Sequence, residues 1–159
     1  MSDTHKNQVL LRKPFLQEKD VDYIFHLGDD YEDIDGNFDI LENKQLFRVP
    51  GIFNTGYQDG SHPRCLNVQI DNWNFLLVHF LNDVISVPPT TDIVCYGHTH
   101  RSNYRELDRL FFINPGHLKR EKDRGSEASY IVAELTDNTI KLHWKNLKNE
   151  TILTKIIDK

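Results

Sequence analysis

Cysteine is rare in this sequence of 159 residues, which contains only Cys65 and Cys95. Two cysteines are too few for a disulfide framework, and Cys95 lies in an apolar stretch where a thiol serves as a small core side chain. No stretch approaches the roughly 18 consecutive apolar residues that a membrane-spanning helix needs. A basic start followed by an apolar stretch, which would predict a secretory signal, is also missing. We therefore expect a cytoplasmic protein in a reducing setting, with no membrane partner.

An excess of positive charge is missing as well. Acidic residues number 24 and Lys plus Arg number 19, so the formal net charge is −5. This balance argues against broad nucleic-acid binding, which depends on basic patches. A small anionic substrate remains compatible with it, because bound metal ions supply positive charge locally.

The length and composition are those of one globular domain spanning residues 1–159. Strands are predicted over residues 21–27, 45–49, 64–70, 74–78, 92–96, 102–107, 110–113, 128–135, 139–144 and 151–157. Helices are predicted from Gln8, capped by Asn7 and broken or restarted at Pro14, and over residues 38–43 and 80–86. Residues 50–57 are predicted to be a loop, and the acidic run over residues 31–43 a solvated face. This order of elements predicts an α/β fold of two sheets with helices outside.

The segment Gly97-His98-Thr99-His100 follows the apolar strand predicted over residues 92–96. Alternate residues of an extended segment point to the same side, so His98 and His100 can face one pocket. These two histidines are therefore candidate metal ligands. The alternative is a pair of hydrogen-bonded histidines in a turn.

Side chains of the same kinds follow other predicted strands. Asp3 and His5 alternate near the start, Asp29 follows Gly28 at the end of a strand, and His79 ends another strand. In open α/β sheets, ligands gather beyond the carboxyl ends of the strands. Each residue alone has a structural alternative: a polar terminus, a turn aspartate or a core histidine. Their shared placement favours a common metal site.

Two carboxylates and four imidazoles are too many ligands for one tetrahedral ion. They suit two divalent ions about 3.5–4 Å apart that share a carboxylate. The centre would be net positive and would favour a phosphate ester, with a bridging hydroxide attacking the phosphorus. We expect manganese, with nickel, iron, cobalt or zinc as alternatives, because the ligands include imidazoles and no thiolate.

Together these motifs resemble the calcineurin-like metallophosphoesterases, in particular the small prokaryotic phosphodiesterases. The matching segments are Ser2-Asp3-Thr4-His5, Leu27-Gly28-Asp29, Val49-Pro50-Gly51, Val78-His79, Gly97-His98-Thr99-His100 and Asn114-Pro115-Gly116. The resemblance implies a four-layer α-β-β-α sandwich of two mixed sheets flanked by helices. It also implies that Asp3, His5, Asp29 and His100 hold one ion, while Asp29, His79 and His98 hold the other together with an asparagine.

That asparagine is replaced in this chain. Ile52 stands at its position and cannot bind metal, so Asn54, two residues further on, is the substitute candidate. Asn37, in Gly36-Asn37-Phe38-Asp39, imitates the family's Gly-Asn-x-Asp/Glu motif. It comes before the strand predicted over residues 45–49, which that motif should follow, so we interpret it as a decoy. Phe53 replaces the residue that serves as general acid in many relatives, and Phe80 replaces a glycine.

The start of the chain is a second departure from the resemblance. In relatives a buried apolar strand precedes Asp-x-His, whereas only Met1 and Ser2 precede it here. Either the true start lies upstream, the chain is trimmed, or the sheet lacks its first strand. We predict about 5–7 further apolar residues upstream in the complete protein, the length of an ordinary strand.

Two functions fit these observations. The first is a metal-dependent phosphoesterase, more a phosphodiesterase than a phosphomonoesterase, acting on a small phosphate ester. The second is a catalytically weak interaction module, as in the retromer scaffold subunit of this superfamily. Substrate contacts are expected from residues 58–63 and 117–125, although a solvated basic loop is the favoured interpretation of His117, Lys119 and Arg120. A homo-oligomer is compatible with the sequence.

Overall fold

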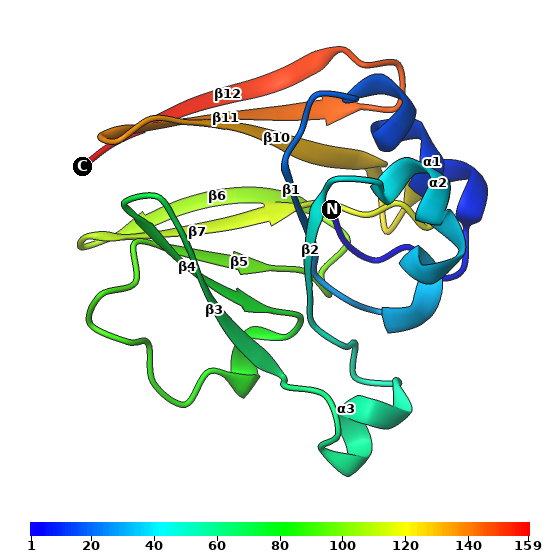
Figure 1. Cartoon of the computed structure of the whole chain (residues 1–159), viewed down its shortest axis with the longest axis horizontal. Coiled ribbons are helices and arrows are strands. Elements are labelled where there is room, and N and C mark those ends of the chain that lie inside the picture. Colours follow the sequence, from blue (N-terminus) through cyan, green and yellow to red (C-terminus); the bar gives the residue numbers. More distant parts are fainter.

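The structure, a computed structural model, describes residues 1–159 apart from the side chain of Phe38. The helical elements are α1 (Gln8–Gln17), η1 (Tyr31–Asn37), α2 (Phe38–Leu41), α3 (Thr55–Asp59) and η2 (Leu81–Asp83), where η marks a 3-10 helix. The strands are β1 (Tyr23–His26), β2 (Gln45–Arg48), β3 (Cys65–Ile70), β4 (Trp73–Val78), β5 (Ile93–Tyr96), β6 (Ser102–Leu107), β7 (Leu110–Pro115), β8 (Lys122–Asp123), β9 (Ser126–Glu127), β10 (Ser129–Leu135), β11 (Thr139–Asn146) and β12 (Thr151–Asp158). Figure 1 shows β10–β12 facing the five-stranded sheet, with α1 and α2 gathered at one side.

The five-stranded sheet is mixed and has the order β3-β4-β5-β7-β6. Its three inner strands run parallel, and β3 and β6 pair antiparallel at the two edges. The other layer consists of the antiparallel triplet β10-β11-β12 and the separate parallel pair β1-β2. The predicted α/β fold is therefore confirmed. The second mixed sheet is divided in two, because no strand among the described residues joins β1 to β10.

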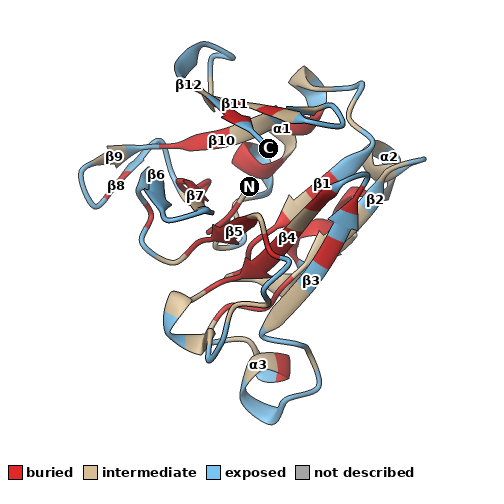
Figure 2. Cartoon of the chain, turned by 90° about the vertical axis from the view of Figure 1, so that its left-hand side faces the viewer, coloured by how far each residue is buried: buried red, intermediate tan, exposed pale blue. Residues whose placement is uncertain are grey.

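The main core lies between these layers. Buried side chains of β4 and β5 meet those of β11, and Figure 2 shows how completely β4 and β5 are buried. Its members from these three strands include Trp73, Phe75, Leu77, Ile93, Leu142 and Trp144. Burying each such side chain stabilises the fold by roughly 1.5–3 kcal/mol. The indole N–H of Trp144 also donates a 2.8 Å hydrogen bond to the carbonyl of Asn114, which fixes the end of β7 beside the site.

Helix α1 begins as predicted and ends later than predicted. The side chain of Asn7 accepts a 3.1 Å hydrogen bond from the Leu10 N–H, which is an ordinary N-cap. The predicted break or restart at Pro14 is wrong, since one continuous helix runs from Gln8 to Gln17. Leu11, Pro14 and Phe15 are buried on one face of the helix, and this packing outweighs the lost backbone hydrogen bond. None of the described helices is long and apolar enough to cross a membrane.

Three other segments differ from the predictions. The helix expected over residues 80–86 is only the short turn η2. The loop expected over residues 50–57 ends in α3, whose start is capped by Asn54 and whose end has Gly60 in the left-handed conformation. The charged segment after Leu118 contains the small hairpin β8-β9.

Residues 1–3 lie beside the end of β1 and position Asp3. The Met1 amino group donates to the Phe25 carbonyl at 2.9 Å. The Leu27 N–H donates to Met1, and the Asp3 N–H donates to Gly28, each at 3.0 Å. Met1 thus pairs as one residue of a parallel strand would.

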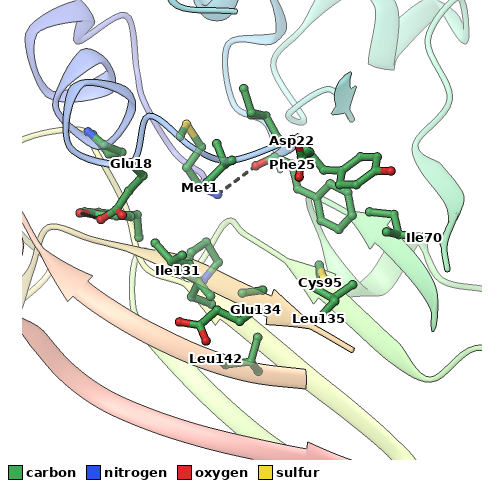
Figure 3. Close-up of a pocket in the computed structure, with 18 of the residues that line it drawn as sticks. Met1, Glu18, Asp22, Phe25, Ile70, Cys95, Ile131, Glu134, Leu135 and Leu142 are labelled. Atoms are coloured by element: carbon green, nitrogen blue, oxygen red, sulfur yellow. Dashed lines mark hydrogen bonds between the residues drawn. The ribbon is translucent and has the colours of Figure 1, made fainter. Parts of the chain in front are cut away.

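A cavity of about 570 Å³ lies next to Met1, between the unpaired edges of β1 and β10. Its walls include Phe25, Cys95, Ile131 and Leu142, and Met1 also lines it, with its amino group toward Phe25 (Figure 3). Burial lowers the pKa of that amino group to about 6. The cavity is therefore a mostly apolar slot flanked by two strand edges, with Glu18 and Glu134 also in its lining.

Candidate metal centre

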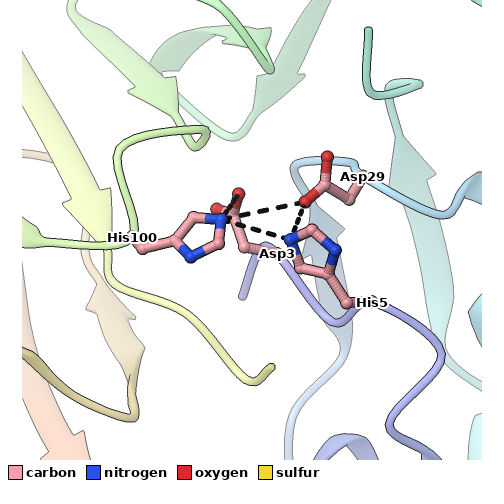
Figure 4. Close-up of side chains that lie close together, drawn as sticks. All are labelled: Asp3, His5, Asp29 and His100. Atoms are coloured by element: carbon pink, nitrogen blue, oxygen red, sulfur yellow. Dashed lines mark hydrogen bonds and ion pairs between the residues drawn. The ribbon is translucent and has the colours of Figure 1, made fainter. Parts of the chain in front are cut away.

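Four of the predicted ligands converge. One ligand atom each from Asp3, His5, Asp29 and His100 lies within 4.8 Å of the others (Figure 4). The Nε2 atom of His100 is 3.2 Å from Asp3 Oδ1 and 3.2 Å from His5 Nε2. Asp29 Oδ2 is 3.9 Å from His100 Nε2 and directly contacts His5 Nε2. Two carboxylates and two imidazole nitrogens around one point form a fitting cage for a divalent cation.

His79 lies on the other side of the Asp29 carboxylate from His5. Its Nδ1 lies 2.7 Å from the Leu27 carbonyl, and its Nε2 lies 3.3 Å from Asp29 Oδ1. That Nε2 is buried and has no hydrogen-bond partner within the described part of the chain. Because Nδ1 donates to a carbonyl, Nε2 carries a lone pair. A buried lone pair facing a carboxylate fits a metal ion that both would bind.

His98 lies next to His79, with their ring centroids 5.3 Å apart. Its backbone N–H donates to Asp3 Oδ2 at 3.0 Å. The ring of Phe80, which replaces the family's glycine, contacts the His98 ring at 4.6 Å between centroids. The structure thus brings all six predicted histidine and aspartate ligands to one region, with four in the tight cluster and His79 and His98 beside it.

The backbone at these residues is unusual. Five of the six have positive φ, which is uncommon for residues other than glycine: Asp3 (54°), His5 (46°), Asp29 (29°), His98 (68°) and His100 (61°). Each such residue costs of order 1–3 kcal/mol, and such strain concentrates at functional sites. The turns after the strands are therefore shaped to aim side chains rather than to minimise energy.

Close backbone contacts explain two glycines at the site. A Cβ on Gly97 would lie 2.9 Å from the Leu27 carbonyl oxygen and 3.0 Å from Asp3 Oδ2. A Cβ on Gly51 would lie 2.7 Å from the Asp29 carbonyl oxygen. Both contacts are tighter than real side chains tolerate, so glycine lets these loops close around the two aspartates.

The charges of the site favour ionised carboxylates. Burial would raise the pKa of Asp29, but the neighbouring imidazoles of His5 and His79 outweigh it and lower that pKa well below its usual range. Burial would lower the pKa values of His79 and His100, but the carboxylates of Asp29 and Asp3 respectively raise them. A centre with two aspartates this close calls for positive charge between them.

Asp33 is a site residue that the sequence did not reveal. It lies in the acidic run predicted to be a solvated face, yet it is 7% exposed. Its carboxylate accepts hydrogen bonds from the Thr4 hydroxyl at 2.6 Å and from the Lys6 N–H at 2.7 Å. Asp33 therefore fixes the turn that carries Asp3 and His5, and the predicted solvated face is wrong at this position.

The asparagines occupy other places. Asn54 Oδ1 accepts from the Gly56 N–H at 2.8 Å, and its Nδ2 donates to Glu32 at 3.0 Å. Oδ1 thus caps the start of α3 and Nδ2 connects it to η1, and a metal-binding role for Asn54 stays a prediction. Asn37 donates to Gln8 at 2.9 Å and packs α1 against η1, away from the cluster.

The interpretation of residues 117–125 as a solvated loop is only partly right. Arg120 is exposed, but His117 is fully buried, with its ring centroid 5.5 Å from that of His100. Its Nε2 lies 3.2 Å from the Ser126 carbonyl. His117 therefore packs against His100 and is not exposed to solvent.

His26, buried beneath the site, makes stability depend on pH. Burial, helped by the charges of the Met1 amino group and Arg48, lowers the pKa of His26 from 6.5 to about 3. Between these values the unfolded state binds a proton that the folded state excludes, so stability falls as pH falls through the window. We expect His26→Gln to remove up to about 1.4 kcal/mol per pH unit of this dependence. Urea unfolding of the wild type and His26→Gln at pH values between about 3 and 6.5 measures this dependence. An equal loss of unfolding free energy per pH unit in the two proteins would contradict the prediction.

Comparison with known proteins identifies the family. The domain model of the calcineurin-like phosphoesterase superfamily matches residues 1–138. The chain belongs to this superfamily, and the resemblance predicted from its motifs is confirmed.

The individual relatives share only about a fifth to a quarter of their residues with this chain. The chain is 26% identical to a phosphodiesterase of Methanocaldococcus jannaschii over 140 residues, which cover 73% of this chain and 80% of that protein. A predicted phosphoesterase from Streptococcus pneumoniae aligns with a TM-score of 0.73 and 20% identity, covering 100% of this chain and 95% of that one. Vps29 from Entamoeba histolytica, complexed with Zn²⁺, aligns with a TM-score of 0.64 and 19% identity, covering 95% and 88%. The two solved structures show a shared fold.

Proposed function

We propose that this protein is a metal-dependent phosphodiesterase that hydrolyses a small phosphate ester with two divalent ions, manganese being the expected metal. The observation that carries the proposal is the convergence of Asp3, His5, Asp29 and His100 on strained backbone. A purely structural cluster would have no reason to hold five residues with left-handed backbone, two of them aspartates. The M. jannaschii relative, a phosphodiesterase, supports the same reaction class.

The candidate ligands form two groups, one for each of the two proposed metal-ion positions. Asp29 is suited to bridge them, because its Oδ2 faces His5 and His100 while its Oδ1 faces His79. Asp3 completes the first position, and His79 with His98 provides the second. Divalent ions held there supply positive charge for the phosphate oxygens and lower the pKa of bound water toward neutrality.

The chain's own side chains give the leaving group little help. Phe53, which stands where many relatives have a general acid, is 81% exposed and has no proton to donate. Protonation of the leaving alcohol is then left to water. We therefore propose that esters of acidic alcohols, such as p-nitrophenol, are hydrolysed faster than esters of simple alcohols.

The test is hydrolysis of bis-p-nitrophenyl phosphate in the presence of Mn²⁺, with wild type and His98→Ala compared. We expect release of p-nitrophenolate by the wild type and a loss of roughly a hundredfold or more in the variant, since a ligand of one ion is gone. His143→Ala is the matched control. That histidine lies on β11 with its Nδ1 3.0 Å from the Thr154 hydroxyl, outside the cluster. Absence of wild-type hydrolysis, or equal rates in wild type and His98→Ala, would overturn the proposal.

A second candidate is an interaction module on the same fold. It is favoured by the likeness to Vps29 and by apolar side chains on the outer strand β12, where Ile152 is 53% exposed and Ile156 is 58% exposed. Such side chains on a strand edge invite a partner. A wild-type protein that binds Mn²⁺ but hydrolyses no ester would favour this function over the enzyme.

A further inference from the structure

The hairpin β8-β9 places a second carboxylate behind His100. Asp123 Oδ2 is 2.5 Å from His100 Nδ1, and the two residues are 23 positions apart in the sequence. The Asp123 side chain is 6% exposed and that of His100 is 2% exposed. A carboxylate this deeply buried costs free energy unless it is paired, so its position calls for an explanation.

The contact determines which imidazole nitrogen is free. A carboxylate accepts hydrogen bonds, so His100 Nδ1 carries the proton that it donates to Asp123, and Nε2 carries the lone pair. That Nε2 is the atom that faces Asp3 Oδ1 at 3.2 Å and His5 Nε2 at 3.2 Å. The hydrogen bond thus turns the ring so that its lone pair points into the cluster.

Asp123 is itself held in place. Its Oδ1 pairs with the Arg120 guanidinium at 2.6 Å, so both carboxylate oxygens are engaged. The exposed Arg120 pair alone contributes little to stability. It does fix the orientation of Asp123, because the two partners approach different oxygens.

The same hairpin contacts the other end of the histidine motif. The Arg124 guanidinium donates to the His98 carbonyl at 3.1 Å. Arg124 and Gly125, at the turn of the hairpin, both have positive φ, 48° and 83°. This tight turn places neighbouring residues against His98 and His100 at once.

We propose that Asp123 is a positioning residue that orients His100 for metal binding, and that the β8-β9 hairpin is part of the metal centre. The proposal rests on the proposed function only in that the cluster binds a divalent ion. Ligating histidines depend on such partners, and loss of the partner weakens metal binding about 10–100-fold.

The first test measures Mn²⁺ binding by titration calorimetry on the full chain. Asp123→Ala is expected to raise the Kd about 10–100-fold, and Asp123→Asn, which keeps the shape but loses the charge, less. The matched control is Asp83→Asn, a carboxylate in η2 that accepts a 2.8 Å hydrogen bond from the Tyr57 hydroxyl. Equal Kd values for the wild type and Asp123→Ala would overturn the proposal.

The second test needs no metal. Long-range proton–nitrogen NMR spectra of the metal-free protein report which imidazole nitrogen is protonated, with His100 assigned by its loss in His100→Gln. At a pH high enough to keep His100 neutral, we expect a pure Nδ1–H form in the wild type and a mixture of both neutral forms in Asp123→Ala. An unchanged Nδ1–H form in folded Asp123→Ala would contradict the positioning role.

The two proposals fail separately. If the wild type binds Mn²⁺, and loss of Asp123 weakens this binding, but no ester is hydrolysed, the positioning role stands and the proposed phosphodiesterase activity is overturned. A wild type that hydrolyses the ester while Asp123→Ala binds Mn²⁺ equally well removes only the positioning role.

Discussion

Replacement of Asp29 by asparagine is expected to lower kcat/KM for bis-p-nitrophenyl phosphate by at least roughly a thousandfold, because the bridging charge that we propose for Asp29 would support several kcal/mol of transition-state stabilisation. The amide keeps the size of the carboxylate but removes its negative charge and one acceptor oxygen. Both oxygens are in use, since Oδ2 contacts His5 and Oδ1 lies 3.3 Å from His79 Nε2. Initial rates in saturating Mn²⁺ measure the effect.

The neighbouring residue provides the control. Asp30 is next in the sequence, and its nearest cationic group, the Lys6 amine, lies 3.9 Å away at the surface. Asp30→Asn is expected to change kcat/KM by less than about threefold, because exposed pairs of this kind contribute little. If Asp29→Asn keeps more than a tenth of the wild-type rate, Asp29 does not bridge the two positions.

An apolar extension of five β-branched residues joined to Met1 is expected to stabilise the protein. The first added residue would lie opposite Phe25 and the next opposite Ile24, because Met1 already donates to the Phe25 carbonyl and accepts from the Leu27 N–H. The added strand would fill the 570 Å³ slot between β1 and β10 and turn two sheet edges into paired strands. It would also replace the buried amino group by a peptide N–H.

The gain in the free energy of unfolding is expected to be roughly 2–5 kcal/mol, after the cost of ordering the added residues is subtracted from their burial. For a chain of this size that corresponds to a rise in Tm of roughly 5–15 °C. Thermal unfolding measures it, and a glycine–serine extension of the same length is the control. Equal Tm values for the two extensions would show that the slot does not accept a strand.

The site was predictable where local pattern and strand direction suffice. His98 and His100 follow the short apolar strand β5, and Asp29 follows β1, so the carboxyl ends of strands from two facing sheets bring them together. The alternation of apolar and polar residues placed most strands within a few residues of their true bounds. These features depend on neighbours in the sequence, which a reader of the sequence can see.

The rest depends on contacts between distant residues. Asp123 faces His100 only because a two-residue turn directs β8 inward, and Asp33 is buried only because the turn of Thr4 and Lys6 needs its carboxylate. In the sequence both aspartates lie in charged stretches that look solvated. The packing of Pro14 against the core likewise overrides its local tendency to end a helix.

The most direct test of the metal-centred account is hydrolysis by the wild-type protein after its metals have been removed with a chelator. Release of p-nitrophenolate from bis-p-nitrophenyl phosphate is followed before and after Mn²⁺ is added back. The account predicts no hydrolysis above the uncatalysed rate without metal and a metal-dependent rate once Mn²⁺ is restored, since in the proposed function Asp3, His5, Asp29 and His100 would act through the ion that they would hold. Hydrolysis that proceeds equally with and without Mn²⁺, or that never rises above the uncatalysed rate, would contradict it.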